Sequence, residues 1–229
     1  MPTKVIISYD GTANEDDALG LGRLLGAAGA ELTVAYVRHT HEPEAEREQL
    51  AEAGAQQLLA RGAELLSYPN VSARVVTDRS TPEGLAALAE SEGADVIVFC
   101  SDSHTAKGHV SIGNSAERLL EGGRTAIAIA PVDLGESDAS IQRIVAIGDG
   151  DGGARETAES LAAALGAVVA PVANQEADLL VVDSRADAQP GQVLLSSSAE
   201  HLIEIATCPV LVVPRGVRLL FGRSSAAVA

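Results

Sequence analysis

Two short polar segments stand where an apolar strand pattern gives way to a helix pattern. Asp10-Gly11-Thr12 follows the apolar run Val5–Tyr9, and Gly113-Asn114-Ser115 opens a helix pattern further along the chain. Carboxylate, amide and hydroxyl groups at such places can contact a bound ligand, but these residue types are also the favoured N-caps of helices. Both interpretations stay open for Asp10 and for Asp149, which ends a later strand pattern.

Other residue types that perform chemistry lack the partners that the chemistry needs. Cys100 ends a strand pattern and no histidine is paired with it by spacing, which favours a small apolar filler over a nucleophile. Ser196–Ser198 has no Gly-x-Ser-x-Gly elbow, and the chain has no Gly-x4-Gly-Lys-Ser/Thr loop. Four histidines follow two strand patterns, but loop histidines are usually solvated; they are His39, His41, His104 and His109. We expect no catalytic residue and no metal site.

The apolar periodicity that must position these residues predicts strands alternating with helices. In the first part of the chain strands are predicted at 5–9, 32–37, 71–76, 96–99 and 126–130. Helices are predicted at 18–25, 42–66, 82–92 and 114–120, the third with Thr81 as its N-cap. This alternation implies parallel pairing through right-handed crossovers, the doubly wound α/β arrangement, in which ligands bind at the carboxyl ends of the strands.

The pattern then repeats in a shorter form. The segment that begins at Arg143 matches the one that begins at Lys4, and Ala177–Asp183 matches Ala94–Cys100. A third match, of Ser198-Ala-Glu-His-Leu-Ile to Ser115-Ala-Glu-Arg-Leu-Leu, comes in the same order, so we infer a tandem duplication. The predicted domains are residues 1–132 and 141–215, followed by a C-terminal tail at 216–229.

The second repeat is too short for a complete copy. Only a few residues separate Val168–Val172 from Leu179–Val182, whereas two parallel strands need a crossover of about a dozen residues. We expect the long helix, the third strand and the next helix to be missing. We also expect 168–172 to be an irregular or displaced strand.

Composition limits the partners. The formal net charge is −16, and Lys4 and Lys107 are the only lysines, so neither nucleic acid nor an anionic membrane is an expected partner. No apolar run approaches the roughly 18 residues that span a bilayer, and the two cysteines show no metal-ligand or disulfide spacing. These features predict a cytoplasmic protein.

The segments around Asp10, Gly29–Val37, Pro82–Val98 and Gly113–Leu120, together with Cys208-Pro-Val-Leu-Val-Val213, resemble those of the universal stress protein family. The resemblance implies an adenine nucleotide alpha hydrolase-like fold. It also implies that the fifth strands of the two copies, 126–130 and 210–213, lie side by side in an intramolecular pseudo-dimer, with further homo-oligomers possible.

The resemblance further implies a nucleotide site. Many members bind ATP or AMP through an acidic residue after the first strand and a Gly-x2-Gly-x9-Gly-Ser/Thr loop. By position, the first repeat would use these residues: Asp10, Gly11, Thr12, Val37, Phe99, Cys100, Ser103, Gly113, Asn114 and Ser115. Cys100 and Ser103 stand where two glycines are expected, and their side chains obstruct the approach of backbone N–H groups to phosphate.

In the second repeat the same count reads Asp183-x2-Ala186-x9-Ser196-Ser197, without a glycine. A carboxylate near a triphosphate costs on the order of 1–4 kcal/mol, so we predict that this repeat binds no nucleotide. The expected function is a non-catalytic stress-response or regulatory module with an eroded nucleotide site. The alternatives are weak ATP or AMP binding with slow phosphate hydrolysis in the first repeat, and an interaction domain without any ligand.

Overall fold

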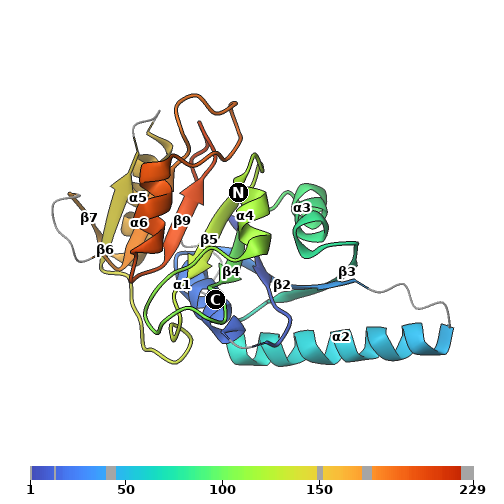
Figure 1. Ribbon diagram of the computed structural model, residues 1–229. Helices are drawn as coiled ribbons and strands as arrows, with labels where there is room; N and C mark the ends of the chain where they lie inside the picture. Colours follow the sequence, from blue (N-terminus) through green and yellow to red (C-terminus); the bar gives the residue numbers. More distant parts are fainter. Residues whose placement is uncertain (1, 13, 40–44, 149–151, 172–176, 223–229) are drawn as a thin grey trace.

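The computed structural model describes residues 2–12, 14–39, 45–148, 152–171 and 177–222 (Figure 1). The first half of the chain contains strands β1 (Lys4–Ser8), β2 (Glu31–Arg38), β3 (Ser72–Thr77), β4 (Val96–Cys100) and β5 (Ala126–Ala130). Its helices are α1 (Glu15–Ala27), α2 (Ala45–Leu66), α3 (Thr81–Glu92) and α4 (Asn114–Leu120). The predicted alternation is confirmed. Thr81, however, is not the N-cap of α3, because Ser80 is extended and its side chain accepts a hydrogen bond from the Glu83 N–H.

The second half contains β6 (Arg143–Ile147), α5 (Gly153–Leu165), β7 (Val168–Ala170), β8 (Leu179–Asp183), α6 (Ser197–Glu204) and β9 (Val210–Val213). All strands join one nine-stranded sheet in the order β3-β2-β1-β4-β5-β9-β8-β6-β7. Every neighbouring pair is parallel except β5 and β9, which are antiparallel. The fold is therefore the predicted doubly wound α/β arrangement, with a reduced second half.

The expectation that 168–172 is displaced is wrong. β7 pairs parallel with β6, Arg143 opposite Val168, just as β2 pairs with β1 in the first half. The connection 171–178 is long enough to lead from the end of β7 back to the start of β8, because β7 has only three residues. An extended segment of that length reaches roughly 26 Å, whereas such a strand rises about 10 Å. Residues 172–176 of this connection lie outside the described part of the chain.

Helices cover both faces of the sheet. Alternate residues of each strand point to opposite faces, so that Val5 and Ile7 pack under α1 and α2 while Ile6 packs on the other side. The first face also carries α5, and the opposite face carries α3, α4 and α6. Both faces of the central strands are buried, which explains their continuous Val, Ile and Ala runs.

The duplication is visible in equivalent hydrogen bonds. The carboxylate of Asp95 accepts from the Lys4 N–H at 2.8 Å, and that of Asp178 accepts from the Arg143 N–H at 2.8 Å. The hydroxyl of Ser101 donates to the Ala130 carbonyl, as the hydroxyl of Ser184 donates to the Val213 carbonyl. These pairs occupy matching positions of the two repeats.

The junction of the two halves has approximate two-fold symmetry. Ile127 lies opposite Val212, Ala128 opposite Leu211, and Ile129 opposite Val210. The loops cross in the same reciprocal way, since the Val110 N–H donates to the Ala206 carbonyl and the Val193 N–H donates to the Gly123 carbonyl. Each half thus presents the same surface to the other, as subunits do in a two-fold dimer.

The segment after β9 packs on α5. Leu219 and Phe221 are buried, and their N–H groups donate to the hydroxyls of Thr157 and Ser160, respectively. The Thr3 hydroxyl donates to the Leu220 carbonyl, which ties this segment to the start of the chain. Residues 217–222 are therefore fixed by packing, and the tail beyond 222 lies outside the described residues.

Candidate functional site

The turn between β1 and α1 is held by two carboxylates. The N–H groups of Asp10 and Gly11 both donate to Oε2 of Glu15, the second over 3.2 Å. Oδ1 of Asp10 accepts from the Thr12 N–H at 2.9 Å, within the turn and before the helix begins. The interpretation of Asp10 as the N-cap of the helix is therefore wrong. The N-cap of α1 is Asn14, which has a left-handed conformation and makes no side-chain cap bond.

Glu15 is the main residue that the sequence analysis missed. Its side chain is buried, with the residue 7 % exposed, and burial followed by the neighbouring charge of Asp10 raises the pKa of its carboxyl group to about 8. The sequence offers only a weak signal, an acidic residue in the first helical turn. Asp16 and Asp17 stand beside it, and nothing local distinguishes the three.

Negative charge gathers around the end of β4 as well. Burial, and then the charges of Glu15 and Asp10, raise the pKa of the Cys100 thiol to about 12. Asp17 is buried and accepts from the N–H groups of Asp133 and Gly135, which fastens the segment after β5 to α1. Lys107, in the loop between β4 and α4, forms an ion pair with Asp133 at 2.9 Å.

The loop between β4 and α4 is closed by its own hydrogen bonds. The buried Ser101 hydroxyl accepts from the Ser111 N–H at 3.1 Å, while the Ser111 hydroxyl accepts from the Asp102 N–H at 3.1 Å. Asn14 reaches across from α1 and donates to the Asp102 carbonyl at 3.3 Å. This bond is the direct link between the β1–α1 turn and the loop.

The other expected loop residues lie apart from this link. Ser103 and Asn114 are exposed, and Ser115 is half-buried at the start of α4. Gly113 is the N-cap of α4, and a Cβ atom placed there would meet nothing within 4 Å. Among the described residues, no hydrogen bond joins the 10–12 turn to 113–115.

Val37 and Phe99 are not on an open ligand surface. They are 5 % and 7 % exposed and belong to the core on the α3 side of the sheet. A Cβ atom on Gly84 of α3 would come within 2.8 Å of Val37, so the helix backbone lies directly over this side chain. The side chain of Leu58 on α2 lies against Gly11, which is itself exposed.

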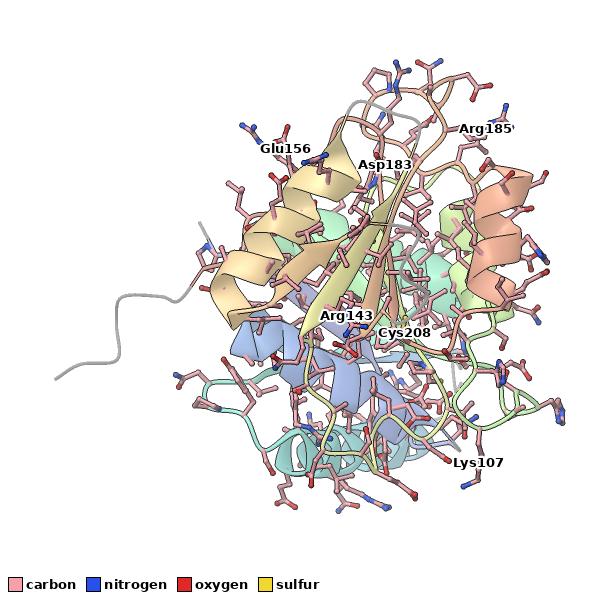
Figure 2. The ribbon with its side chains drawn as sticks, turned by 90° about the vertical axis from the view of Figure 1, so that its left-hand side faces the viewer. Lys107, Arg143, Glu156, Asp183, Arg185 and Cys208 are labelled. Carbon is pink, nitrogen blue, oxygen red and sulfur yellow. The ribbon has the colours of Figure 1, made fainter. Side chains whose placement is uncertain are left out.

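The second half carries its own carboxylate at the equivalent end of the sheet. Oδ1 of Asp183 accepts from the Ala154 N–H at 2.6 Å, at the N-terminus of α5. Asp183 and Arg155 line a cavity of about 560 Å³ at the ends of β6, β7 and β8, and Arg155 pairs with Glu159. Figure 2 shows Asp183 and Lys107 at opposite ends of the molecule, as the antiparallel β5–β9 junction requires. Asp149 lies outside the described residues.

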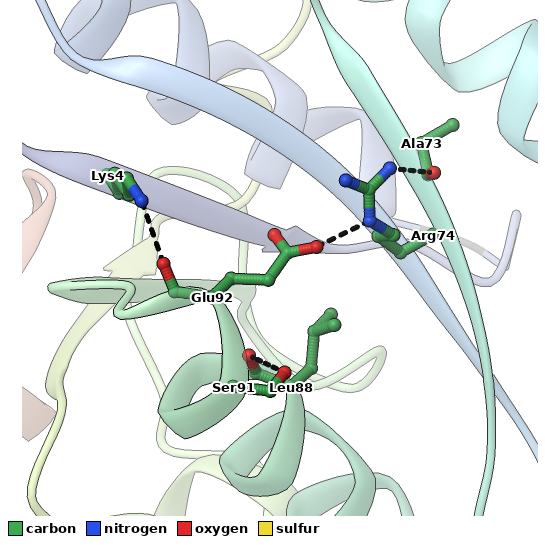
Figure 3. Close-up of polar contacts among 6 residues, drawn as sticks. All are labelled: Lys4, Ala73, Arg74, Leu88, Ser91 and Glu92. Atoms are coloured by element: carbon green, nitrogen blue, oxygen red, sulfur yellow. Dashed lines mark hydrogen bonds and ion pairs between the residues drawn. The ribbon is translucent and has the colours of Figure 1, made fainter.

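A cavity of about 860 Å³ lies at the amino ends of β1, β2 and β3, away from these carboxyl-end sites. Its charged side chains are largely engaged with one another (Figure 3). Arg74 forms an ion pair with Glu92, and the Lys4 ammonium donates to the Glu92 carbonyl at 2.8 Å. This cavity gathers none of the predicted site residues.

Metal sites and membrane-spanning helices are two further possibilities for the described part of the chain. In that part, no three His, Cys, Asp or Glu side chains are grouped so that they could hold a metal ion. Nor does it include a helix that is both long and apolar enough to cross a membrane.

Comparison with known proteins identifies the family. The chain matches the model of the universal stress protein family over residues 1–131 and 166–214. The chain belongs to the universal stress protein family. No curated protein sequence matches significantly.

Solved structures share the fold of this universal stress protein over nearly its whole length. A universal stress protein from Archaeoglobus fulgidus DSM 4304 has a TM-score of 0.66 at 14 % identity, covering 93 % of this chain and 96 % of the other. A putative universal stress protein from Pseudomonas aeruginosa UCBPP-PA14 gives 0.64 at 15 % identity, covering 93 % and 94 %. A functionally unknown protein from Pseudomonas aeruginosa PAO1 gives 0.64 at 14 %, covering 93 % of both chains. At this identity the likeness establishes the fold alone.

Proposed function

We propose that this protein is a non-catalytic stress-response or regulatory module of the cytoplasm, whose first-half nucleotide site is filled by its own side chains. The observation that carries the proposal is the position of Glu15. Its carboxylate already accepts the N–H groups of Asp10 and Gly11, which follow β1 where the resemblance expects the adenosine end of a nucleotide.

Steric contacts support the same conclusion. The Leu58 side chain lies against Gly11, and the α3 backbone at Gly84 covers Val37, so a base or ribose could reach Val37 only if α3 moved. Val37 lies in the core, where packing resists such insertion because extra atoms force neighbouring side chains and backbone to shift.

Electrostatics act in the same direction. A polyphosphate beside the loop after β4 would approach Asp10 and Asp102, while Lys107 is engaged with Asp133. Each nearby carboxylate costs roughly 1–4 kcal/mol of repulsion at partly exposed separations. The backbone N–H groups that would compensate are used by Glu15 and by the loop itself.

Neither cysteine is an activated nucleophile, which supports a non-catalytic role. Burial raises the pKa of the Cys100 and Cys208 thiols to about 12, so both are protonated at neutral pH. Both cysteines are free.

Isothermal titration with Mg-ATP and with AMP tests the proposal, using Glu64→Gln as a control. Glu64 is exposed on α2 and distant in sequence from the β1–α1 turn, so this variant should behave as the original protein. We expect no heat of binding from either protein up to millimolar nucleotide. Native mass spectrometry of the freshly purified protein should likewise show no adenine nucleotide. A co-purifying nucleotide, or saturable ATP binding, would overturn the proposal in favour of a nucleotide-binding first half.

A further inference from the structure

A groove crosses the junction of the two halves on the face that carries α4 and α6. These helices lie on either side of the β5–β9 junction (Figure 1), and the groove between them has a volume of about 460 Å³. Its lining includes four pairs of equivalent residues, one from each repeat, together with Val110 and Leu120: Ser111 and Leu194, Ile112 and Leu195, Glu117 and Glu200, and Glu121 and Glu204. The groove therefore exists only because the two halves are joined.

The backbone of this groove is held in place by the reciprocal loop crossings. The Val110 N–H donates to the Ala206 carbonyl, and the Gly122 N–H and Val193 carbonyl form a further bond between the halves at 2.8 Å. Val110 and Val193 are almost completely buried. The walls of the groove are thus part of the core and need no rearrangement to exist.

The floor is apolar and partly accessible. Leu120 and Leu195 are buried beneath it, Ile112 is half-buried, and Leu194 is 37 % exposed. An exposed leucine on top of a buried apolar floor is an attachment point for an apolar side chain of a partner.

The rim carries only negative charge. Glu117 and Glu121 come from α4, and Glu200 and Glu204 are their counterparts on α6; all four are exposed. No lysine or arginine lines the groove. Glu204 makes a weak contact with His201 at 3.7 Å, which is an ion pair only if the imidazole is protonated.

Charge complementarity selects the occupant. A second copy of this chain is disfavoured because its net charge is −16. A nucleic acid or an anionic lipid would be repelled by the same carboxylates. We propose that the groove binds a segment of another protein in which one or two apolar side chains are flanked by Lys or Arg.

This inference extends the proposed function, since a module without a nucleotide would act through such a partner, but it does not depend on nucleotide binding. The ATP titration measures binding at the carboxyl ends of β1 and β4, whereas the peptide experiment measures binding between α4 and α6. Failure of one therefore leaves the other unaffected.

The test uses a fluorescein-labelled amphipathic peptide of twelve residues, with leucine at helical spacing and lysine elsewhere. Fluorescence anisotropy measures its binding to the full chain. We expect saturable binding that weakens with salt, and no binding of the same peptide with glutamate in place of lysine.

Matched variants locate the binding. Glu117→Gln with Glu200→Gln should weaken binding about tenfold, whereas Glu31→Gln with Glu64→Gln, equal in charge change and outside the groove, should change it less than about twofold. Leu194→Ser should also weaken binding. Leu65→Ser, on α2 and 39 % exposed, should not.

Thermal unfolding of each variant checks that it is folded. Equal losses in the groove and control pairs would mean unspecific attraction to an acidic protein, and would overturn the proposal. The proposal is also overturned if the lysine peptide does not bind at a concentration of about 0.1 mM, which is on the order of the Kd of weak specific contacts.

Discussion

Glu15 accepts a hydrogen bond from the backbone N–H of Gly11 at 3.2 Å, across the turn that joins the first strand to the first helix. This contact places a buried carboxylate on amides at the edge of the sheet where the family resemblance expects a ligand. Asp183 accepts from the N–H of Ala154 at 2.6 Å in the second half. Each repeat thus has a carboxyl group that accepts backbone N–H groups near the start of its first helix, although the two carboxyl groups come from different positions.

The raised pKa of Glu15 predicts a pH dependence of stability. Its pKa is about 8 in the folded chain and near 4.5 when unfolded, so between these values the folded state binds more protons. The free energy of unfolding should therefore fall as pH rises from about 4.5 to about 8. Glu15→Gln should remove this component and be the more stable protein at pH 9, by on the order of 1–4 kcal/mol.

Urea unfolding of both proteins at pH 5, 7 and 9 measures this difference. Glu159→Gln, an exposed change on α5, is the control and should keep the pH dependence of the original protein. A difference between Glu15→Gln and the original protein that is constant across this range would contradict the assignment.

The two buried serine hydroxyls should both contribute to the stability of the folded chain. Ser101 and Ser184 each donate to a strand carbonyl and accept a backbone N–H from the following loop, at 3.1 Å and 3.4 Å, respectively. Replacing either by alanine removes both side-chain bonds and leaves the loop N–H without this acceptor, although the strand carbonyl keeps the backbone N–H of residue 101 or 184. The loss should be about 1–3 kcal/mol, with Ser101→Ala the larger because its accepted bond is shorter.

Thermal unfolding of the two variants checks this expectation. Ser91→Ala is a suitable control, because the Ser91 hydroxyl is exposed and bonds only to the Leu88 carbonyl within its own helix (Figure 3). Its effect should stay within about 0.5 kcal/mol. Serine variants at 101 and 184 that were as stable as this control would show that the loops are not held by these hydroxyls.

The segment after β9 should contribute to the stability of the second half. Leu219 is 3 % exposed against α5, whereas the adjacent Leu220 is 60 % exposed. Leu219→Ala should therefore lower the free energy of unfolding by about 2–4 kcal/mol, and Leu220→Ala by less than about 0.5 kcal/mol. Chemical unfolding of this pair is a direct test, and similar losses from both variants would refute the packing.

Both thiols should react slowly in the folded protein. Burial is the main cause of the raised pKa, about 12, of both Cys100 and Cys208, so the thiolate fraction at pH 8 is very small. With Ellman's reagent we expect slow modification that accelerates as the pH increases, and rapid reaction of both thiols in urea. Rapid reaction of either thiol in the native protein at pH 8 would disprove the burial of that site.

Much of the fold could be predicted from the sequence because its determinants are local. The strand runs and the helix periodicity place β1, α3 and β5 within a few residues of their observed bounds, and the matched segments reveal the duplication. The helix cap was misplaced by one residue, at Ser80 instead of Thr81, because both hydroxyls can cap and only the backbone conformation decides between them. β7 was wrongly expected to be displaced because the required crossover length depends on strand length, and β7 is unusually short.

The candidate site could not be predicted from local sequence patterns in the same way. Val37, Phe99 and Cys100 occupy the strand ends that the motif count gives, yet two of the three are buried. The burial of Val37 comes from the α3 backbone at Gly84, and Glu15 lies close enough to Cys100 of β4 for its charge to raise the pKa of that thiol. Such contacts join residues far apart in the chain, and no local pattern encodes them.

The sequence by itself determined the alternation of strands and helices, the doubling of the chain and its strong negative charge, since each depends on residue type and spacing alone. Only the tertiary structure decided that Glu15 lies on the Asp10–Gly11 turn and that α4 and α6 share one groove. The physical reason is that hydrogen-bond partners and burial depend on which elements the sheet order brings together, and here that order joins the two repeats edge to edge through β5 and β9.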